Sequence, residues 1–387
     1  MTFTRRRYLK TMLAGVPVLA GCTTMLPGAA GFQPLPTRAQ ALDALARAND
    51  YWQAHNPPTH WAFWDYAAYH TGNMAAFDVT RRQDWLRYST AWAEHNLWMG
   101  AKEPDQRKWK YSYGETDEYV LFGDWQICFQ TYIDLYRTDG SRDPGKIARA
   151  LEVMRHQVET PNLDYWWWAD GLYMVMPVMT KLYRLTGERR YLDKLVDYFT
   201  WADKLIFDQQ AGLYYRDGRY VYPKHKSANG GKDFWSRGDG WVFAGLAKVL
   251  ADLPHDHASR PLFLDRYRRM AAALKKAQQE EGYWARSLLD PGFAPGRETS
   301  GTAFFTYGYL WGMNHGLLDK AEYTPVVARS WRYLSTIALQ ADGKVGYVQP
   351  IGDRAIPGQH IGRDATTPFG VGAFLLAAAE MSRFAAA

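Results

Sequence analysis

The sequence is short of cysteine. Its 387 residues include two, Cys22 and Cys128, so the chain itself can form at most one disulfide bond. The spacings that typically hold zinc, an HExxH helix or paired cysteines, do not occur among its two cysteines and 10 histidines. We therefore expect no resident metal ion.

Several other signals are missing too. No glycine-rich phosphate loop follows a strand, so no nucleotide cofactor is expected. No convincing run alternates polar and apolar residues as a strand does. The net charge is +6, but four of the cations lie at the extreme N-terminus, and charges of both signs alternate along the rest, as in Glu188–Lys194. That pattern is typical of a solvated helical surface rather than a nucleic-acid interface, although a mild positive bias would help to attract an anionic substrate.

The longest apolar stretch near the N-terminus, Met12–Ala20, is too short to span a bilayer. It follows Thr4–Lys10, which resembles a twin-arginine export motif, and precedes Leu19–Cys22, which resembles a bacterial lipobox. We therefore predict a signal peptide over residues 1–21, lipidation of Cys22 and a tether over 22–37. The alternative is an ordinary signal peptide with an incidental cysteine.

These features predict an exported protein, a periplasmic or outer-membrane lipoprotein of a Gram-negative bacterium. Its only contact with a membrane would be the N-terminal lipid anchor. With Cys22 lipidated, no intrachain disulfide is possible, and Cys128 is most simply a small buried hydrophobic residue. The oligomeric state is not predicted.

Aromatic residues, in contrast, are abundant. They make up 16% of the chain, with 17 Trp and 26 Tyr, and hydrophobic residues reach 47%, which is ample for a large core. Each buried indole N–H needs a partner, so core packing alone seldom uses this many Trp. Trp and Tyr also form platforms for sugar rings, so composition leaves two interpretations open: a carbohydrate cleft, or aromatic packing between many helices.

From residue 38 onward the hydrophobic period is helical, as in the stripe Ala41, Leu45, Ala48 and Trp52. A unit recurs: an aromatic-rich entry, an acid or small polar residue, an apolar helix, a turn and an amphipathic helix. Six such starts occur, at Trp64, Asp124, Asp170, Asp239, Thr302 and Gly370. Unequal linkers disfavour an open solenoid, so we predict that 38–387 form a closed double ring of six inner and six outer helices.

In such a ring the N-termini of the inner helices gather at one end, where their acids and aromatic rings would face one pocket. Asp170 lies in Trp168–Val175 and Asp239 in Ser236–Val242, both beside aromatic residues. A carboxylate among indole and phenol rings is poorly solvated, so it can keep its proton and give it to a substrate. This indicates acid catalysis on a carbohydrate. The alternative is that each aspartate merely caps its own helix.

Four segments, in order, resemble those of the unsaturated glucuronyl and rhamnogalacturonyl hydrolases, most closely glycoside hydrolase family 105, which is allied to family 88. They are Gln130–Tyr136, Trp168–Met174, Trp235–Trp241 and Glu298–Ala303. The likeness covers roughly residues 40 to 382. The four motifs are specific together, and none would be alone.

The resemblance implies an all-α fold, the (α/α)6 barrel of six helical hairpins. It also implies an oligosaccharide substrate with a terminal 4,5-unsaturated uronic acid, a product of polysaccharide lyases, and no cofactor. The implied chemistry is hydration of a vinyl ether. Asp170 would protonate C4, water would add at C5, and the resulting hemiketal would open and expel the rest of the chain.

The resemblance also assigns roles. Asp170 would be the proton donor and base, and Asp124 would support the ring or orient the water. Arg237 would bind the uronate carboxylate or a hydroxyl through its planar fork, with Trp235 and Trp241 lining the sugar site. The further substrate-binding candidates are Trp168, Arg216, Asp239 and Thr302. Structural alternatives stay open: Arg237 could pair with Asp239, and Trp241 could be helix core.

Two departures from the family pattern concern the substrate. Asp239 stands where the family has asparagine, and Arg216 stands where members often carry histidine. These changes leave two alternatives beside the unsaturated-uronyl hydrolase. One is a hydrolase of a saturated uronide or another glycoside, with Asp124 and Asp170 as its acid pair. The other is a surface glycan-binding lipoprotein without catalysis.

Overall fold

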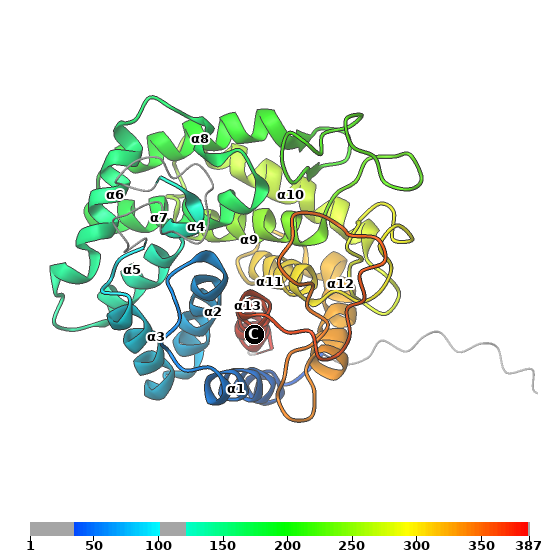
Figure 1. The fold of residues 1–387 in the computed structure, drawn as a ribbon, viewed down its shortest axis with the longest axis horizontal. Coiled ribbons are helices and arrows are strands. Elements are labelled where there is room, and N and C mark those ends of the chain that lie inside the picture. The colour runs from blue at the N-terminus through cyan, green and yellow to red at the C-terminus, as the bar shows by residue number, and fades with distance from the viewer. Residues whose placement is uncertain (1–34, 101–120, 386–387) are drawn as a thin grey trace, which may run out of the picture. The chain divides into compact units, whose positions relative to one another are not determined.

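The computed structural model describes residues 35–100 and 121–385, and in them six inner helices form a closed ring, each packing against the next (Figure 1). These inner helices are α2 (Trp64–Thr80), α5 (Cys128–Thr138), α7 (Ala169–Thr186), α9 (Ser236–Asp252), α11 (Thr299–Asn314) and α13 (Pro368–Phe384). The outer helices are α1 (Arg38–His55), α3 (Gln83–His95), α6 (Ala148–Glu159), α8 (Arg190–Ile206), α10 (Arg260–Ala277) and α12 (Lys320–Tyr333). The all-α prediction of helical hairpins in a closed double ring is confirmed.

Five hairpins pair an inner helix with the outer helix that follows it, but the sixth joins the two ends of the ring. The last inner helix, α13, packs against the first helix of the ring, α1. Periodicity alone could not identify this partner, because the two helices are more than 300 residues apart. The helix predicted from Asp124 also differs, since it is divided into a short α4 (Gly123–Gln126) and α5.

The ring closes where α13 packs against α2, and the backbones of the two helices are in direct contact there. A methyl group at Gly72 would lie 2.2 Å from the carbonyl oxygen of Gly372, and one at Gly372 would lie 2.5 Å from that of Ala68. No larger residue fits at either position without separating the helices. These two glycines therefore set how closely the first and last inner helices approach.

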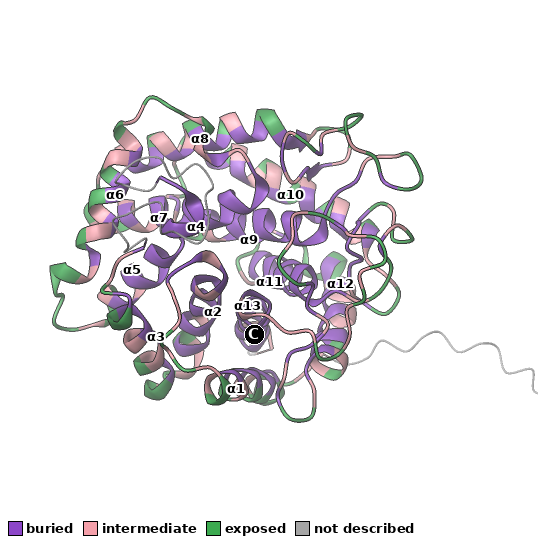
Figure 2. Ribbon diagram, in the orientation of Figure 1, coloured by how far each residue is buried: buried purple, intermediate pink, exposed green. Residues whose placement is uncertain are grey.

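Burial separates the two layers of the ring (Figure 2). The inner helix α11 is buried from Thr299 to Met313 without interruption, whereas α1 buries one stripe that includes Ala41, Leu45, Ala48 and Trp52. A helix surrounded by other helices is apolar on all sides, and one at the surface is apolar only toward the core. The stripe predicted from the sequence is thus the core-facing side of α1.

Shorter elements lie in the connections. They are η2 (Pro144–Ile147), η3 (Asp164–Trp166), η4 (Leu334–Ala338), and the strands β1 (Phe207–Asp208) and β2 (Leu213–Tyr214), which pair antiparallel. The strands were not predicted, because two-residue strands carry no alternating pattern. The long connection over 339–367 reaches back to the starts of α9 and α11 through hydrogen bonds to its backbone.

Three predictions concern the membrane and the cysteines. The signal peptide, the lipidation of Cys22 and most of the tether lie outside the described residues. Among the helices that are described, none combines the length and apolar character that crossing a bilayer requires. Cys128 is fully buried as a free thiol within α5, which confirms its prediction as a small core residue.

Candidate active site

The starts of the inner helices meet at one end of the ring, and Asp170 and Asp124 lie there. Each is in the first turn of its helix, and each is largely buried, with 8% and 9% of its surface exposed. Helix α4 packs so closely on α7 that a methyl group at Gly123 would touch Val175 at 3.1 Å. The structure therefore brings the two predicted catalytic segments side by side.

The aspartates do not serve as helix N-caps. The N-cap residues of α4, α7 and α9 are Phe122, Trp168 and Trp235, none of which makes a capping hydrogen bond through its side chain. The first-turn carboxylates still gain from the helix dipole. Capping alone therefore does not explain the aromatic residue before each acid.

The aromatic entries form a cluster of their own, separate from the main core. It contains Phe63, Phe122, Trp125 and Trp168, with Trp61, Trp64 and Trp167 packed against it. Phe122 and Trp168 stack with centroids 5.0 Å apart. These rings come from the segments that begin α2, α4 and α7, so three of the predicted entries do converge at the end of the ring that holds Asp170.

Arg216 lies directly beside Asp170. The carbonyl oxygen of Arg216 accepts a hydrogen bond from the backbone N–H of Ala169, at 2.8 Å, which ties this loop to the start of α7. The Nε atom of Arg216 is 3.5 Å from Oδ2 of Asp170, and its guanidinium lies 5.4 Å from the ring centre of Trp167. The residue at the family's histidine position is thus a cation in contact with the predicted proton donor.

Burial raises the pKa of Asp170, because a carboxylate removed from water loses its hydration. The positive charges of Arg216 and Arg237 oppose this effect without cancelling it. The carboxyl therefore keeps its proton to a higher pH than an exposed aspartate does. That property suits a group which must donate a proton near neutral pH.

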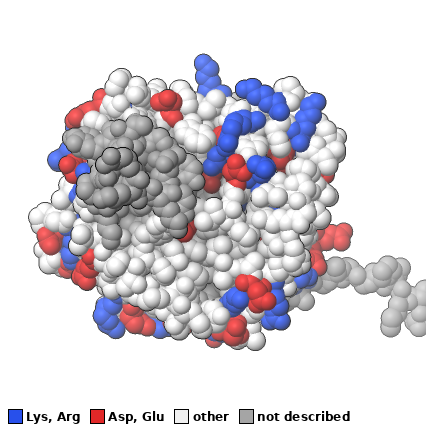
Figure 3. Space-filling model, in the orientation of Figure 1, with Lys and Arg blue, Asp and Glu red and all other residues white. Residues whose placement is uncertain are grey.

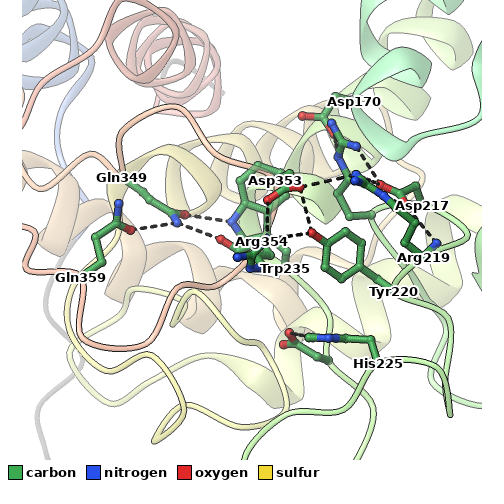
Figure 4. Close-up of polar contacts among 12 residues, drawn as sticks. Asp170, Asp217, Arg219, Tyr220, His225, Trp235, Gln349, Asp353, Arg354 and Gln359 are labelled. Carbon is green, nitrogen blue, oxygen red and sulfur yellow. Dashed lines mark hydrogen bonds and ion pairs between the residues drawn. The ribbon is translucent and has the colours of Figure 1, made fainter. Parts of the chain in front are cut away.

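A hydrogen-bond network joins the loop that carries Arg216 to the 339–367 connection. Asp217, Arg219, Tyr220 and Asp353 of this network are drawn in Figure 4. Asp217 accepts from Arg216 at 2.7 Å and from Arg219 at 2.9 Å, and its own side chain is almost fully buried. Asp353, from the 339–367 connection, accepts from the hydroxyl of Tyr220 at 2.8 Å. These hydrogen bonds connect the two loops and hold the side chain of Arg216 beside Asp170.

Arg237 is fully buried, and its fork is already occupied. Nη1 donates to the carbonyl oxygen of Gln349 at 2.7 Å, and Nη2 donates to that of Pro350 at 2.9 Å. The guanidinium lies between the rings of Trp235 and Phe369, and burial lowers its pKa to about 10. The guanidinium that was predicted to bind the uronate thus binds the backbone of the 339–367 connection instead.

Other predicted substrate contacts are part of the core. Asp239 is fully buried and accepts from the backbone N–H of Tyr214 at 2.8 Å; burial raises its pKa well above the usual range. No ion pair between Arg237 and Asp239 exists in the described part of the chain. Trp241 packs against Tyr173 and Phe304, so its alternative interpretation as helix core is the one that the structure supports.

Thr302 and Trp235 are buried as well. The hydroxyl of Thr302 donates to the carbonyl oxygen of Glu298 at 2.7 Å and accepts from the N–H of Trp284 at 3.0 Å. The indole of Trp235 donates to Oε1 of Gln349 at 2.8 Å. Both side chains therefore form hydrogen bonds with the segments around the site, and their role in substrate binding stays a prediction. Of the predicted residues, Asp124, Asp170, Arg216 and Trp168 are the ones that the structure gathers at the mouth of the ring.

Sequence reasoning missed Trp167, Asp217 and the 339–367 connection. The run of aromatic residues before Asp170 could have indicated Trp167, which is partly exposed beside Arg216. Nothing in the sequence connects Asp353 to Tyr220 or Gln349 to Arg237, because these contacts join loops more than 110 residues apart.

A model of the family described as glycosyl hydrolase family 88 matches residues 39–385 of the chain. An unsaturated 3S-rhamnoglycuronyl hydrolase of Formosa agariphila is 37% identical over 220 residues, which are 56% of this chain and 57% of that protein. The chain thus spans little more than half the length of this curated relative.

Two solved structures are similar over nearly their whole length. One, described as a polysaccharide lyase, is 61% identical with a TM-score of 0.85, over 90% of this chain and 98% of that one. The other, a family 88 glycosyl hydrolase from Bacteroides vulgatus, is 54% identical with a TM-score of 0.86, over 90% and 100%. The predicted kinship with families 105 and 88 is confirmed.

Proposed function

Because the chain belongs to glycosyl hydrolase family 88, we propose that it removes a terminal 4,5-unsaturated uronic acid from oligosaccharides that polysaccharide lyases release. The observation that carries this proposal is the buried carboxyl of Asp170, with a raised pKa, beside Arg216 and a cluster of aromatic rings. The curated relative named for hydrolysis of an unsaturated uronide supports the same substrate class.

In the proposed reaction, Asp170 gives its proton to C4 of the double bond, and positive charge develops at C5 and the ring oxygen. The carboxylate that remains stabilises this charge and then takes a proton from the water that adds at C5. The hemiketal so formed opens and releases the rest of the oligosaccharide. Asp124, on the neighbouring α4, would orient the water or support the ring.

The charge of the surrounding surface supports an anionic substrate. Figure 3 shows Lys and Arg side chains gathered on the side of the face where the loops between β2 and α9 lie. Arg219, Lys224 and Lys226 in those loops are exposed. Such a patch attracts uronate or sulfate groups over distances comparable to the Debye length, so it would speed the encounter more than it strengthens binding.

A second candidate is supported by the 61% identical structure described as a polysaccharide lyase. β-Elimination requires a base that removes the proton at C5 of a saturated uronide, a cation that neutralises the uronate carboxylate, and a proton, which water can give, for the oxygen that leaves C4. Asp170 in its ionised form and Arg216 could supply the two. The same residues would thus serve either reaction, but the raised pKa of Asp170 favours the hydrolase, in which this carboxyl begins as a proton donor.

The two candidates change ultraviolet absorbance in opposite directions. We expect unsaturated oligosaccharides from several lyases to lose the absorbance of the conjugated enol-ether carboxylate when the protein is added, because hydration removes the double bond. Saturated uronides should remain unchanged. A rise in that absorbance with saturated uronides would instead establish the lyase. No change in absorbance with either substrate, and no release of free sugar from the saturated uronide, would favour the glycan-binding alternative.

We also propose that the protein is exported and anchored to a membrane by a lipid on Cys22. The support is the resemblance of residues 4–22 to an export motif and a lipobox. In a Gram-negative host, Cys22→Ala is expected to move the protein from the membrane fraction to the soluble fraction, whereas Thr24→Ala should leave it in the membrane. If both variants fractionate as the wild type does, the anchor is not at Cys22.

A further inference from the structure

The opposite mouth of the ring holds a cavity of about 480 Å³. All six inner helices contribute to it through their C-terminal halves, for instance with Lys181 of α7 and Lys248 of α9. Lys181 follows Asp170 by eleven residues on α7, so the cavity lies about 16 Å from the candidate active site, measured along the axis of that helix. Its size falls within the range of small-molecule pockets.

The acids that line this cavity already have cationic partners. Asp134 pairs with Lys181, and Asp78 pairs with Arg81 at 2.8 Å and with Arg383 at 2.7 Å. The same Arg383 also pairs with Glu380. No carboxylate of the lining is therefore left to neutralise a further cation.

Lys248 is that further cation. Its Nζ forms no hydrogen bond or ion pair with any residue in 35–100 or 121–385, and lies 5.5 Å from the ring centre of Tyr173. Asp252, one turn further along α9, is bound by Arg184 at 3.0 Å and by the hydroxyl of Thr180 at 3.1 Å. An ammonium group held in a pocket without a counter-ion is costly, and an anion would relieve that cost.

Neutral hydrogen-bond donors and an apolar wall accompany Lys248. The hydroxyl of Tyr307 and the indole Nε1 of Trp311 form no hydrogen bond within the described residues. Burial and the nearby Glu380 raise the pKa of Tyr307 well above its usual range, so its hydroxyl stays protonated. Met74 and Leu376 complete the lining with apolar surface. Charge, donors and apolar wall together match a small organic acid.

We propose that this cavity binds a small carboxylate, whose anionic group contacts Lys248 and whose body lies against Trp311, Met74 and Leu376. The site would be distinct from the mouth that holds Asp170, and its existence does not depend on the reaction at that mouth. Two sources of the carboxylate are compatible with the lining, a simple organic acid and a sugar acid, and direct titration distinguishes them.

Calorimetric titration of the full chain with propionate, glucuronate and uncharged glucose tests the proposal. The two acids should bind with one-to-one stoichiometry and glucose should not. Lys248→Met should weaken propionate binding at least tenfold, while the matched exposed variant Lys276→Met should not change it. Equal affinity for both acids would mean that the carboxylate alone is recognised, and tighter binding of glucuronate that Lys248→Met also weakens would identify a sugar acid in this cavity.

Binding should also depend on pH. Burial lowers the pKa of Lys248 to about 8, with Lys181 adding to the effect and Asp134 and Asp252 opposing it. Propionate affinity of the wild type should therefore fall about tenfold between pH 7 and pH 9, which tests the proposal even if Lys248→Met fails to fold. A wild type that binds neither acid, a variant that binds as well as the wild type, or an affinity independent of pH would overturn it.

Discussion

Replacing Asp170 with asparagine is expected to lower kcat about a thousandfold while the protein still binds its oligosaccharide. The amide has nearly the shape of the carboxyl but cannot give or take the proton, and acid–base catalysis of this kind typically contributes about 10²–10⁴-fold. Steady-state kinetics on unsaturated oligosaccharides would measure the loss of turnover, and calorimetry would measure binding.

The same variant should be at least as stable as the wild type. In the folded state the pKa of Asp170 is raised, so between its unfolded and folded values the folded chain holds more protons, and stability falls as pH rises through that window. At neutral pH the side chain of Asp170 is ionised in the unfolded chain, so its burial on folding has a free-energy cost that asparagine does not have. We expect the Tm of Asp170→Asn to equal or exceed that of the wild type at pH 7, and the difference to vanish in acid.

Asp164→Asn is the matched control, because Asp164 lies in η3 near the same mouth but is exposed. It should keep both turnover and Tm. Full turnover by Asp170→Asn would remove Asp170 from the chemistry. A fall in Tm together with the loss of turnover would mean that the side chain mainly supports the fold.

Replacing Arg237 with methionine is expected to destabilise the protein by about 3 kcal/mol, which corresponds to a fall in Tm of about 4 °C for a chain of this length. Methionine fills the space between Trp235 and Phe369 but leaves the carbonyl oxygens of Gln349 and Pro350 without their donors. Buried acceptors without partners account for most of the expected loss. Thermal unfolding measures it.

The variant Arg237→Lys tests whether Arg237 holds the 339–367 connection in place or binds the substrate. A single ammonium cannot bridge two carbonyl oxygens as a planar fork does, so Arg237→Lys should also lose stability. Arg332→Met, at an exposed position on α12, should not. An unchanged Tm with a raised KM would instead assign Arg237 to substrate binding, as the family resemblance implied.

Much of the ring followed from local pattern. The apolar stripe of α1, the turn after Thr186 with Gly187 at a positive φ of 75°, and the aromatic residue before each first-turn acid are short-range features. Helical period and capping act within a few residues, so a sequence can display them directly. They were sufficient to predict the closed double ring and the neighbourhood of Asp170.

The functions of individual site residues depended on contacts across the fold. Whether Arg237 binds substrate or holds a loop depends on Gln349 and Pro350, and whether Asp239 lies in the cleft or in the core depends on Tyr214. The first and last helices of the ring likewise pack together, α13 against α1. The amino-acid sequence by itself determined the helices and the order of their acids. Only the tertiary structure decided which polar groups already have hydrogen-bond partners within the protein. A hydrogen bond between residues far apart in the chain produces no pattern in the sequence.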